Sequence, residues 1–198
     1  MKKIVFTNQK GGVGKSTLAL NFGYYLNLKG YKVCFVDMDN NQLVLHRTVQ
    51  SINTFRNIND VGKGYDYCII DTAPYITNEY ETVLKKSDLI VIPIQITLPD
   101  YIGLEKVISS VKKYKKKTLI LPNKIKGNRL SKVKMEILHE IEKFNVPISE
   151  PYIRDYTLYS DTFISENGIF SQNEIARHKN VITNFVEIAE WIINKYKL

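Results

Sequence analysis

The sequence predicts an α/β fold in which helices cover both faces of a doubly wound, mostly parallel sheet, giving three layers. Short, continuously apolar runs, the pattern of strands buried on both faces, alternate with longer stretches whose apolar residues recur at helical spacing. Several of the apolar runs end directly in acidic or amide residues, at the place where open parallel sheets bind their ligands.

The composition fits one ordinary globular domain, residues 1–198, with a substantial core. No apolar run approaches the roughly 20 residues of a membrane span. The start, Met1-Lys2-Lys3, leads straight into an apolar run, so we expect no signal peptide and a cytoplasmic protein. Cys34 and Cys68 lie in apolar runs, and we expect both to be reduced core residues rather than disulfide partners or metal ligands.

The strongest motif lies near the start of the chain. Residues 4–6 predict a buried strand and residues 18–28 a helix. Between them the chain places three glycines, a lysine and a hydroxyl group, in Gly11, Gly12, Gly14, Lys15 and Ser16. Glycines let backbone N–H groups converge on phosphate oxygens, and the helix N-terminus adds partial positive charge. This is the P-loop arrangement, in which Lys15 reaches the β- and γ-phosphates and Ser16 ligates Mg²⁺. A glycine-rich turn without a ligand would not explain this combination.

The loop departs from the strict P-loop pattern, because Gln9 stands where that pattern has a glycine and an extra lysine, Lys10, precedes the glycines. Residues 10–17, Lys-Gly-Gly-Val-Gly-Lys-Ser-Thr, resemble the deviant Walker A motif of the ParA/MinD ATPase family. The resemblance implies a P-loop NTPase fold and an ATP site made by Gly11, Gly12, Val13, Gly14, Lys15, Ser16 and Thr17. It also implies that Lys10 reaches across a nucleotide-sandwiched homodimer to the γ-phosphoryl group.

Two further strands are expected to end in carboxylates. Residues 33–36 predict a buried strand that ends at Asp37 and Asp39, and residues 67–70 predict another that ends at Asp71. At this distance after a P-loop, the second pattern is a Walker B motif, whose carboxylate orders Mg²⁺ through water.

The family resemblance assigns the first pair of carboxylates. It implies that Asp39 positions the attacking water and that Asp37 supports the Mg²⁺ water shell. The family usually continues with Pro-Gln, where this chain has Asn40-Asn41. The alternative is that both aspartates only cap a loop.

The segment between these strands is compact. We expect a short helix over 43–49, a short edge strand over 51–55 and a turn over 62–64. Relatives carry a longer segment here. The shortness resembles the small plasmid-type ParA proteins, which lack an N-terminal DNA-binding extension.

The next two strand–helix pairs continue the alternation. We expect helices over 79–86 and from Pro99 to about Tyr114, and strands over 89–92, closed by Pro93, and over 118–121. Asn123 follows the last of these strands. The resemblance implies that Asn123 reads the adenine edge, for which an amide supplies both a donor and an acceptor. A turn-forming Asn after Pro122 is the alternative.

The remainder of the chain is expected to be mostly helical. Apolar residues at helical spacing predict a helix over 130–144 and one long C-terminal helix over 172–196. Between them we expect a short strand or loop over 147–151 and one short helix within 157–168. By analogy with the family, residues 152–154 flank the adenine. The apolar stripe of the C-terminal helix is expected to pack on the core, through Ile175, Ile182, Phe185, Ile188, Ala189 and Ile192. Insertion of its tip, 191–198, into a membrane is the alternative.

Positive charge is unevenly distributed. The net charge is +8, and residues 106–134 contain no Asp or Glu. Eleven basic residues fall in this window: Lys106, Lys112, Lys113, Lys115, Lys116, Lys117, Lys124, Lys126, Arg129, Lys132 and Lys134. Such a stretch could contact a phosphate backbone without reading bases. A solvated lysine surface is the alternative.

Together these features predict an ATP- and Mg²⁺-dependent ATPase that partitions DNA. The resemblance implies an ATP-dependent homodimer, non-specific DNA binding, nucleoid association in the ATP state, and reset by a centromere-binding ParB-like adaptor. Two alternatives remain: a MinD-like switch on a membrane, which we do not expect, and an ATP-gated DNA-binding regulator with negligible turnover.

Overall fold

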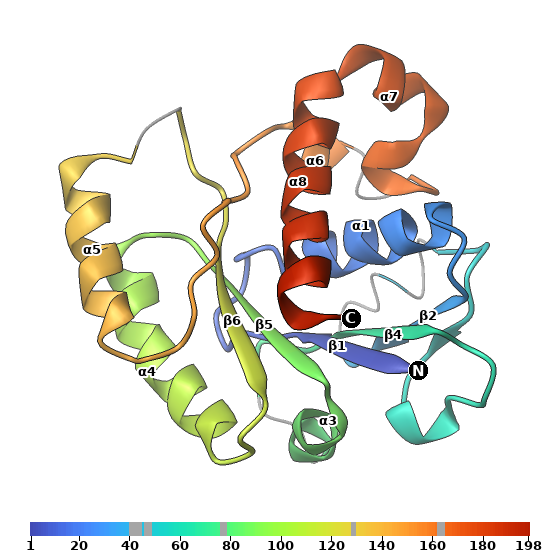
Figure 1. Ribbon diagram of the computed structural model, residues 1–198, viewed down its shortest axis with the longest axis horizontal. Coiled ribbons are helices and arrows are strands. Elements are labelled where there is room, and N and C mark those ends of the chain that lie inside the picture. The colour runs from blue at the N-terminus through green and yellow to red at the C-terminus, as the bar shows by residue number, and fades with distance from the viewer. Residues whose placement is uncertain (40–44, 46–48, 76–78, 128–129, 162–164) are drawn as a thin grey trace.

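The fold is a six-stranded sheet with helices on both faces (Figure 1). The computed structural model describes residues 1–39, 45, 49–75, 79–127, 130–161 and 165–198. The strand order is β3-β2-β4-β1-β5-β6, and every pair of neighbouring strands is parallel. The strands are β1 (Lys2–Phe6), β2 (Val33–Asp37), β3 (Thr54–Phe55), β4 (Tyr67–Asp71), β5 (Leu89–Ile94) and β6 (Lys117–Pro122). The predicted three-layer α/β architecture is confirmed.

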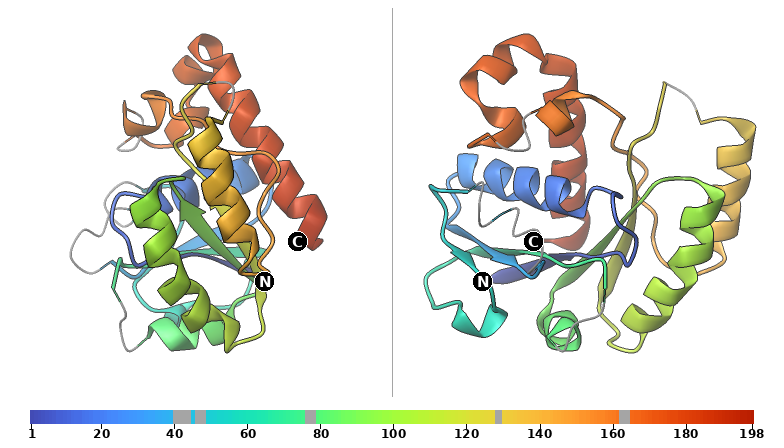
Figure 2. Two further views of the ribbon diagram at one scale, coloured as in Figure 1. Left: turned by 90° about the vertical axis from the view of Figure 1, so that its left-hand side faces the viewer. Right: turned by 180° about the vertical axis from the view of Figure 1, so that it is seen from behind.

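Two hydrophobic clusters form the core, one on each face of the sheet, and successive strand residues alternate between them. Ile4 joins the cluster beneath α1 and α8, whereas Val5 joins the one above α3 and α4. The helices on the first face are α1 (Lys15–Leu28), α6 (Leu158–Asp161) and α8 (Lys179–Tyr196), and those on the second are α3 (Tyr80–Lys86), α4 (Leu98–Lys112) and α5 (Lys132–Glu142). Figure 2 shows the two helical layers flanking the sheet. Strands β2, β4 and β5 are buried along their whole length, and their sequences are apolar up to the aspartates that end β2 and β4.

The register brings the carboxyl ends of three strands together. Phe6 of β1 pairs with Asp71 of β4, and Asp37 of β2 pairs with the same residue. The chain leaves β1 directly into the glycine loop and α1. The predicted carboxylates and the P-loop therefore share one edge of the sheet, as expected for parallel strands.

One expected strand boundary was wrong. Pro93 does not close β5, which continues to Ile94. The pairing of β5 with β1 stops at Val91, so no ladder partner on that side requires an N–H group from Pro93. The Pro93 carbonyl instead accepts a hydrogen bond of 2.8 Å from the Asn8 side chain, which fixes the start of the glycine loop.

The C-terminal helix also differs from the expectation. It is broken at His178, whose backbone is not helical (φ −126°, ψ 43°), into α7 (Gln172–Arg177) and α8. Helix α7 buries none of its residues, and Ile175 is 47% exposed rather than part of the core stripe. Of these two helices, only α8 buries an apolar face against the core.

The short edge strand within 51–55 is confirmed as β3, and both cysteines are buried and free, as predicted. Two short 3₁₀ helices complete the chain, η1 (Ile58–Asp60) and η2 (Gly168–Phe170). The helix expected over 43–49 lies mostly outside the described residues. In the described ranges, no helix is both long enough and apolar enough to cross a membrane.

Candidate nucleotide-binding site

The glycine loop has the backbone conformation that its sequence requires. Gly12 and Gly14 have positive φ angles of 73° and 98°, which residues with a Cβ rarely adopt. Gly14 is the N-cap residue of α1, and no side chain caps this helix. The first N–H groups of α1 are therefore left to face a ligand, as in helix-terminal anion sites.

The loop encloses a cavity of about 200 Å³, referred to below as the phosphate pocket. Its lining comprises Gly11, Gly12, Gly14, Lys15, Ser16, Thr17, Asp39, Pro74 and Lys124. Most residues predicted for the ATP phosphates are thus brought together. Val13, which belongs to the same loop, is fully buried and does not line the pocket.

Lys15 is the buried cation of this pocket. It is 7% exposed, and its Nζ donates a 3.1 Å hydrogen bond to the Lys10 backbone carbonyl. Burial lowers the pKa of Lys15, and the nearby carboxylates of Asp71 and Asp39 oppose this shift. The ammonium group thus lies in a poorly solvated site, where an anionic ligand would interact with it strongly.

The three predicted carboxylates lie at the ends of β2 and β4. Asp37 and Asp71 are almost fully buried, and Asp39 is 7% exposed at the wall of the phosphate pocket. Neither carboxylate oxygen of Asp71 has a hydrogen-bond partner within the described ranges. Burial raises the pKa of Asp71 to about 7, and the neighbouring Asp37 adds to this shift while Ser16 and Lys15 oppose it. A buried carboxylate without a partner is costly unless a cation or water accompanies it.

These residues fit Mg²⁺ in the way expected when phosphate supplies part of the shell. In the part of the chain that the structure describes, no cluster of three or more His, Cys, Asp or Glu side chains could hold a metal alone. Mg²⁺ commonly uses one or two carboxylates, waters and substrate phosphates. Ser16 and Asp71, with Asp37 beside them, offer this donor set next to the phosphate pocket.

The side chain of Lys10 points away from the phosphate pocket. Its Nζ forms an ion pair of 2.7 Å with Asp100 in the first turn of α4, and its side chain is 42% exposed. The Asp100 side chain is 1% exposed and also accepts a hydrogen bond from the Thr97 hydroxyl. Lys10 does not line the phosphate pocket of its own chain.

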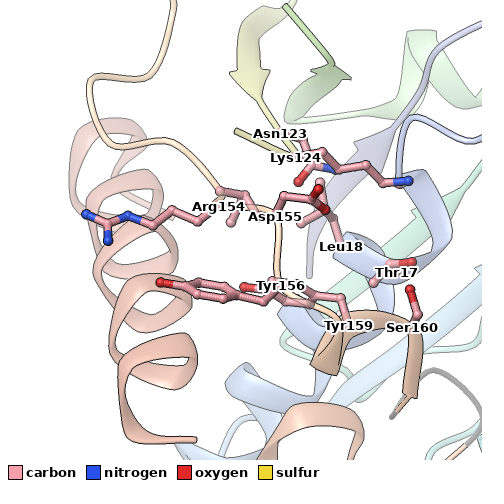
Figure 3. Close-up of a pocket in the computed structure, with 11 residues that line it drawn as sticks. Thr17, Leu18, Asn123, Lys124, Arg154, Asp155, Tyr156, Tyr159 and Ser160 are labelled. Carbon is pink, nitrogen blue, oxygen red and sulfur yellow. The ribbon is translucent and has the colours of Figure 1, made fainter. Parts of the chain in front are cut away.

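A second cavity, of about 260 Å³, adjoins the first and is referred to below as the base pocket (Figure 3). Asn123 lies on its wall, and its Nδ2 donates a 2.7 Å hydrogen bond to the Val13 carbonyl. The Asn123 Oδ1 accepts no hydrogen bond from the described residues, so it can accept one from a ligand amine. A Cβ on Gly14 would lie 2.3 Å from the same Nδ2, so glycine is needed where the two pockets meet.

Sequence reasoning missed most of the base pocket. Of the three residues expected to flank the adenine, Ile153 and Arg154 line this cavity and Tyr152 does not. The residues that were not predicted are Leu18, Lys124, Asp155, Tyr156, Tyr159 and Ser160. The segment is placed by backbone bonds from Ile125 to Ile153 and from Asp155 to Ile125, each 3.0 Å, and no local sequence signal announces such a long-range pairing.

The chain is similar in sequence to proteins with known family names. The chain is 23% identical to a ParA family protein of Mycoplasma pneumoniae over 171 residues, which cover 83% of this chain and 62% of that relative. It therefore spans less than two thirds of that relative's length. It is also 60% identical to the chromosome-partitioning ATPase Soj of Treponema pallidum over 38 residues, covering 19% of this chain and 15% of Soj.

The solved structures share the fold. The cobyrinic acid a,c-diamide synthase of Mycobacterium smegmatis, with an ATP analogue and magnesium bound, matches with a TM-score of 0.74 and 14% identity. The match covers 100% of this chain and 96% of that one. The model of the CobQ/CobB/MinD/ParA nucleotide-binding domain matches residues 4–169. The chain therefore belongs to the CobQ/CobB/MinD/ParA nucleotide-binding family.

Proposed function

We propose that this chain is a Mg²⁺-dependent ATPase that partitions DNA. ATP binding joins two copies face to face, the dimer holds DNA without sequence preference, and hydrolysis returns the subunits to the monomeric state. A centromere-binding adaptor of the ParB type stimulates the hydrolysis, and the ATP state associates with the nucleoid. ATP acts here as a population switch, because its γ-phosphate favours only the dimer. The partitioning role is supported by the named function of the Soj relative.

The observation that carries the proposal is the placement of Lys10. Its ammonium group lies on Asp100, outside the phosphate pocket of its own chain. Phosphoryl transfer needs a cation to meet the charge that develops on the γ-phosphoryl group. A loop lysine whose ammonium group lies outside the phosphate pocket of its own chain can supply that positive charge to the pocket of a second copy. Release from Asp100 would accompany dimerisation.

The remaining groups have separate roles in this proposal. Lys15 binds the β- and γ-phosphates, and Asp39, at the pocket wall, positions the attacking water. Ser16 ligates Mg²⁺ directly, while Asp37 and Asp71 hold its water shell. The metal, when bound, neutralises phosphate charge. The catalytic residues of the proposal are thus Lys10, Lys15 and Asp39.

The basic stretch does not form a single patch. Strand β6 divides it, so that one group of lysines lies on α4 and in the chain up to the start of β6, and the other lies after β6 and in the first turn of α5 (Figure 1). The first group comprises Lys106, Lys112, Lys113, Lys115, Lys116 and Lys117, and the second Lys124, Lys126, Lys132 and Lys134, while Arg129 lies outside the described residues. In the first group, Lys113 pairs with Glu81 at 2.6 Å and Lys117 donates to the Tyr196 carbonyl at 3.1 Å. The second group lies at the nucleotide end, where dimerisation would bring two copies of it together.

A membrane role receives less support. The alternative of a MinD-like switch needs an apolar tip at the end of α8 that is available to lipid. Trp191, Ile193 and Leu198 instead pack against the core cluster, and Tyr196 is buried. The third reading, an ATP-gated regulator, differs from the partition ATPase only in having negligible turnover.

Co-sedimentation with DNA tests the proposal. The protein is mixed with long duplex DNA, or with anionic liposomes, at 50 and 300 mM salt, with MgATP, MgADP or no nucleotide. We expect DNA binding that needs ATP and falls steeply with salt, because several phosphate contacts release counterions. Binding to liposomes but not DNA would contradict the proposal and support the membrane switch.

A Lys10→Ala variant separates the ATPase from the regulator. We expect it to bind ATP with nearly unchanged affinity but to lose turnover in the presence of DNA and adaptor. Lys63→Ala, which removes an exposed lysine outside both pockets and outside the basic stretch, serves as the control. Normal ATPase activity in Lys10→Ala would refute the role across the dimer, and absence of turnover in the unmodified protein with DNA and adaptor would favour the regulator.

A further inference from the structure

Lys124 lies at the border between the two cavities. It is the one residue besides Gly14 and Thr17 that lines both the base pocket and the phosphate pocket, among the residues that the structure describes. Figure 3 shows its side chain extending toward the loop that precedes α1, where its Nζ reaches the Gly12 carbonyl. The sequence grouped Lys124 with a basic stretch, but its position is inside the nucleotide site.

The fold fixes the direction of this side chain. The N–H of Asn123 donates to the Ile94 carbonyl at 2.7 Å, and the N–H of Ile125 donates to the Ile153 carbonyl at 3.0 Å. Lys124 is held between these two anchored residues at a φ of 55°, an uncommon conformation for a residue with a Cβ. The backbone therefore presents Lys124 to the site before any ligand binds.

The ammonium group has a weak partner in this state. Lys124 Nζ donates a 3.0 Å hydrogen bond to the Gly12 carbonyl, which also accepts one of 3.3 Å from Gln95. Within the described ranges, no carboxylate lies within 4.0 Å of this ammonium group, in contrast to Lys10 on Asp100. The charge of Lys124 is thus held on a neutral glycine carbonyl at the edge of a phosphate-sized cavity.

We propose that Lys124 is a phosphate-binding residue of the nucleotide site, which exchanges the Gly12 carbonyl for a phosphate oxygen of a bound nucleoside di- or triphosphate. A charge-assisted hydrogen bond to phosphate is stronger than one to a carbonyl. Because Lys124 also borders the base pocket, its partner is a phosphate near the ribose, so ADP and ATP are held alike. The inference rests on nucleotide binding and is independent of dimerisation and DNA.

The test compares affinities across a ligand series. Lys124→Ala and Lys126→Ala each remove one lysine charge, two residues apart, but only Lys124 lines the site. Affinities for adenosine, ADP and ATP are measured by competition against a fluorescent nucleotide. We expect Lys124→Ala to weaken ADP and ATP by about tenfold, as for loss of one hydrogen bond to a charged group. Adenosine affinity should change less than twofold, Lys126→Ala should match the unmodified protein, and Lys124→Arg should retain most of the affinity.

Three results would overturn the inference. Unchanged ADP affinity in Lys124→Ala would show that the contact with Gly12 is only structural. An equal loss for adenosine and ADP would show that the substitution disturbs the pocket rather than removing a phosphate contact. Loss of DNA binding by Lys124→Ala with unchanged nucleotide affinity would show that Lys124 contacts DNA rather than the nucleotide. Failure of the unmodified protein to bind any nucleotide would instead refute the nucleotide site itself.

Discussion

The phosphate pocket and the base pocket adjoin one another but are built in different ways. The phosphate pocket comes mostly from the loop between β1 and α1 and from the first turn of α1, whose lining residues fall within 11–17 and are close together in sequence. The base pocket joins Asn123 and Lys124 to residues 153–160, which reach the loop only through long-range packing. The difference shows that one nucleotide site can depend on local backbone geometry at one end and on tertiary structure at the other.

The two pockets also differ in the side chains that line them. The phosphate pocket contains buried charges, Lys15 and Asp39, with Asp71 beneath them, which are costly without a ligand. The base pocket combines apolar and aromatic groups such as Leu18, Ile153 and Tyr159 with polar and charged ones. Changes in the first should therefore mainly alter binding and pH dependence, whereas changes at the junction should also alter stability.

The largest effect is expected from Lys15→Ala. Lys15 would contact two phosphate groups, and loss of two charge-assisted hydrogen bonds corresponds to about 4 kcal/mol, or roughly a thousandfold in ATP affinity. Calorimetric titration with MgATP measures this loss, with the exposed Lys115→Ala as control. Tight ATP binding by Lys15→Ala would remove the assignment of the phosphate pocket.

The junction of the pockets is tested by Gly14→Ala. The new Cβ would lie 2.3 Å from Asn123 Nδ2 at a φ of 98°, so the hydrogen bond from Asn123 to Val13 must break. We expect a loss of about 3 kcal/mol in the free energy of unfolding, from backbone strain and the lost hydrogen bond. Urea unfolding without nucleotide measures it. Gly11→Ala is the control, because its Cβ would meet no atom within 4 Å. Equal stability of the two variants would contradict the close approach.

The buried carboxylate predicts a pH dependence of stability. The pKa of Asp71 is raised from 3.8 to about 7, so between these values the folded chain holds a proton that the unfolded chain has lost. Stability should therefore fall as the pH rises through this window. From pH 5 to 7 the cost is about 2 kcal/mol, at roughly 1.4 kcal/mol per unit.

Urea unfolding in EDTA, comparing the unmodified protein with Asp71→Asn, measures this cost. The stability difference between the two should grow in favour of Asp71→Asn from pH 5 to 7 and level off above that range. A difference that is independent of pH would show that Asp71 is ionised throughout.

The smallest effect concerns base selection. Asn123 uses Nδ2 on Val13, which leaves Oδ1 to accept from an exocyclic amine such as that of adenine, whereas guanine presents a carbonyl there. Asn123→Ala should lose about tenfold in the preference for ATP over GTP. Competition binding of the two nucleotides measures the ratio, and an unchanged preference would assign base selection to other groups of the base pocket.

The sequence predicted the layers and the phosphate pocket because both depend on short-range patterns. Continuous apolar runs identified the central strands, and the spacing of glycines and lysines identified the loop. The base pocket could not be predicted in full, because Tyr156 and Tyr159 reach it through folding of the second half of the chain. The break at His178 was also missed, since α7 and α8 share a helical sequence pattern and differ in burial.

The partner of Lys10 was likewise not visible in sequence. Asp100 lies 90 positions further along the chain, and only the packing of α4 beside the loop brings the two together. This ion pair holds the Lys10 ammonium group on α4, outside the lining of the phosphate pocket, and the proposed exchange of cations between two subunits depends on it.

Sedimentation of the Asp39→Ala variant tests that exchange most directly. With hydrolysis blocked, saturating MgATP should convert the 22.9 kDa chain into a stable particle of twice that mass, while MgADP should leave single subunits. A variant that binds MgATP yet remains a single subunit would contradict the face-to-face dimer and the DNA-partitioning function proposed from it.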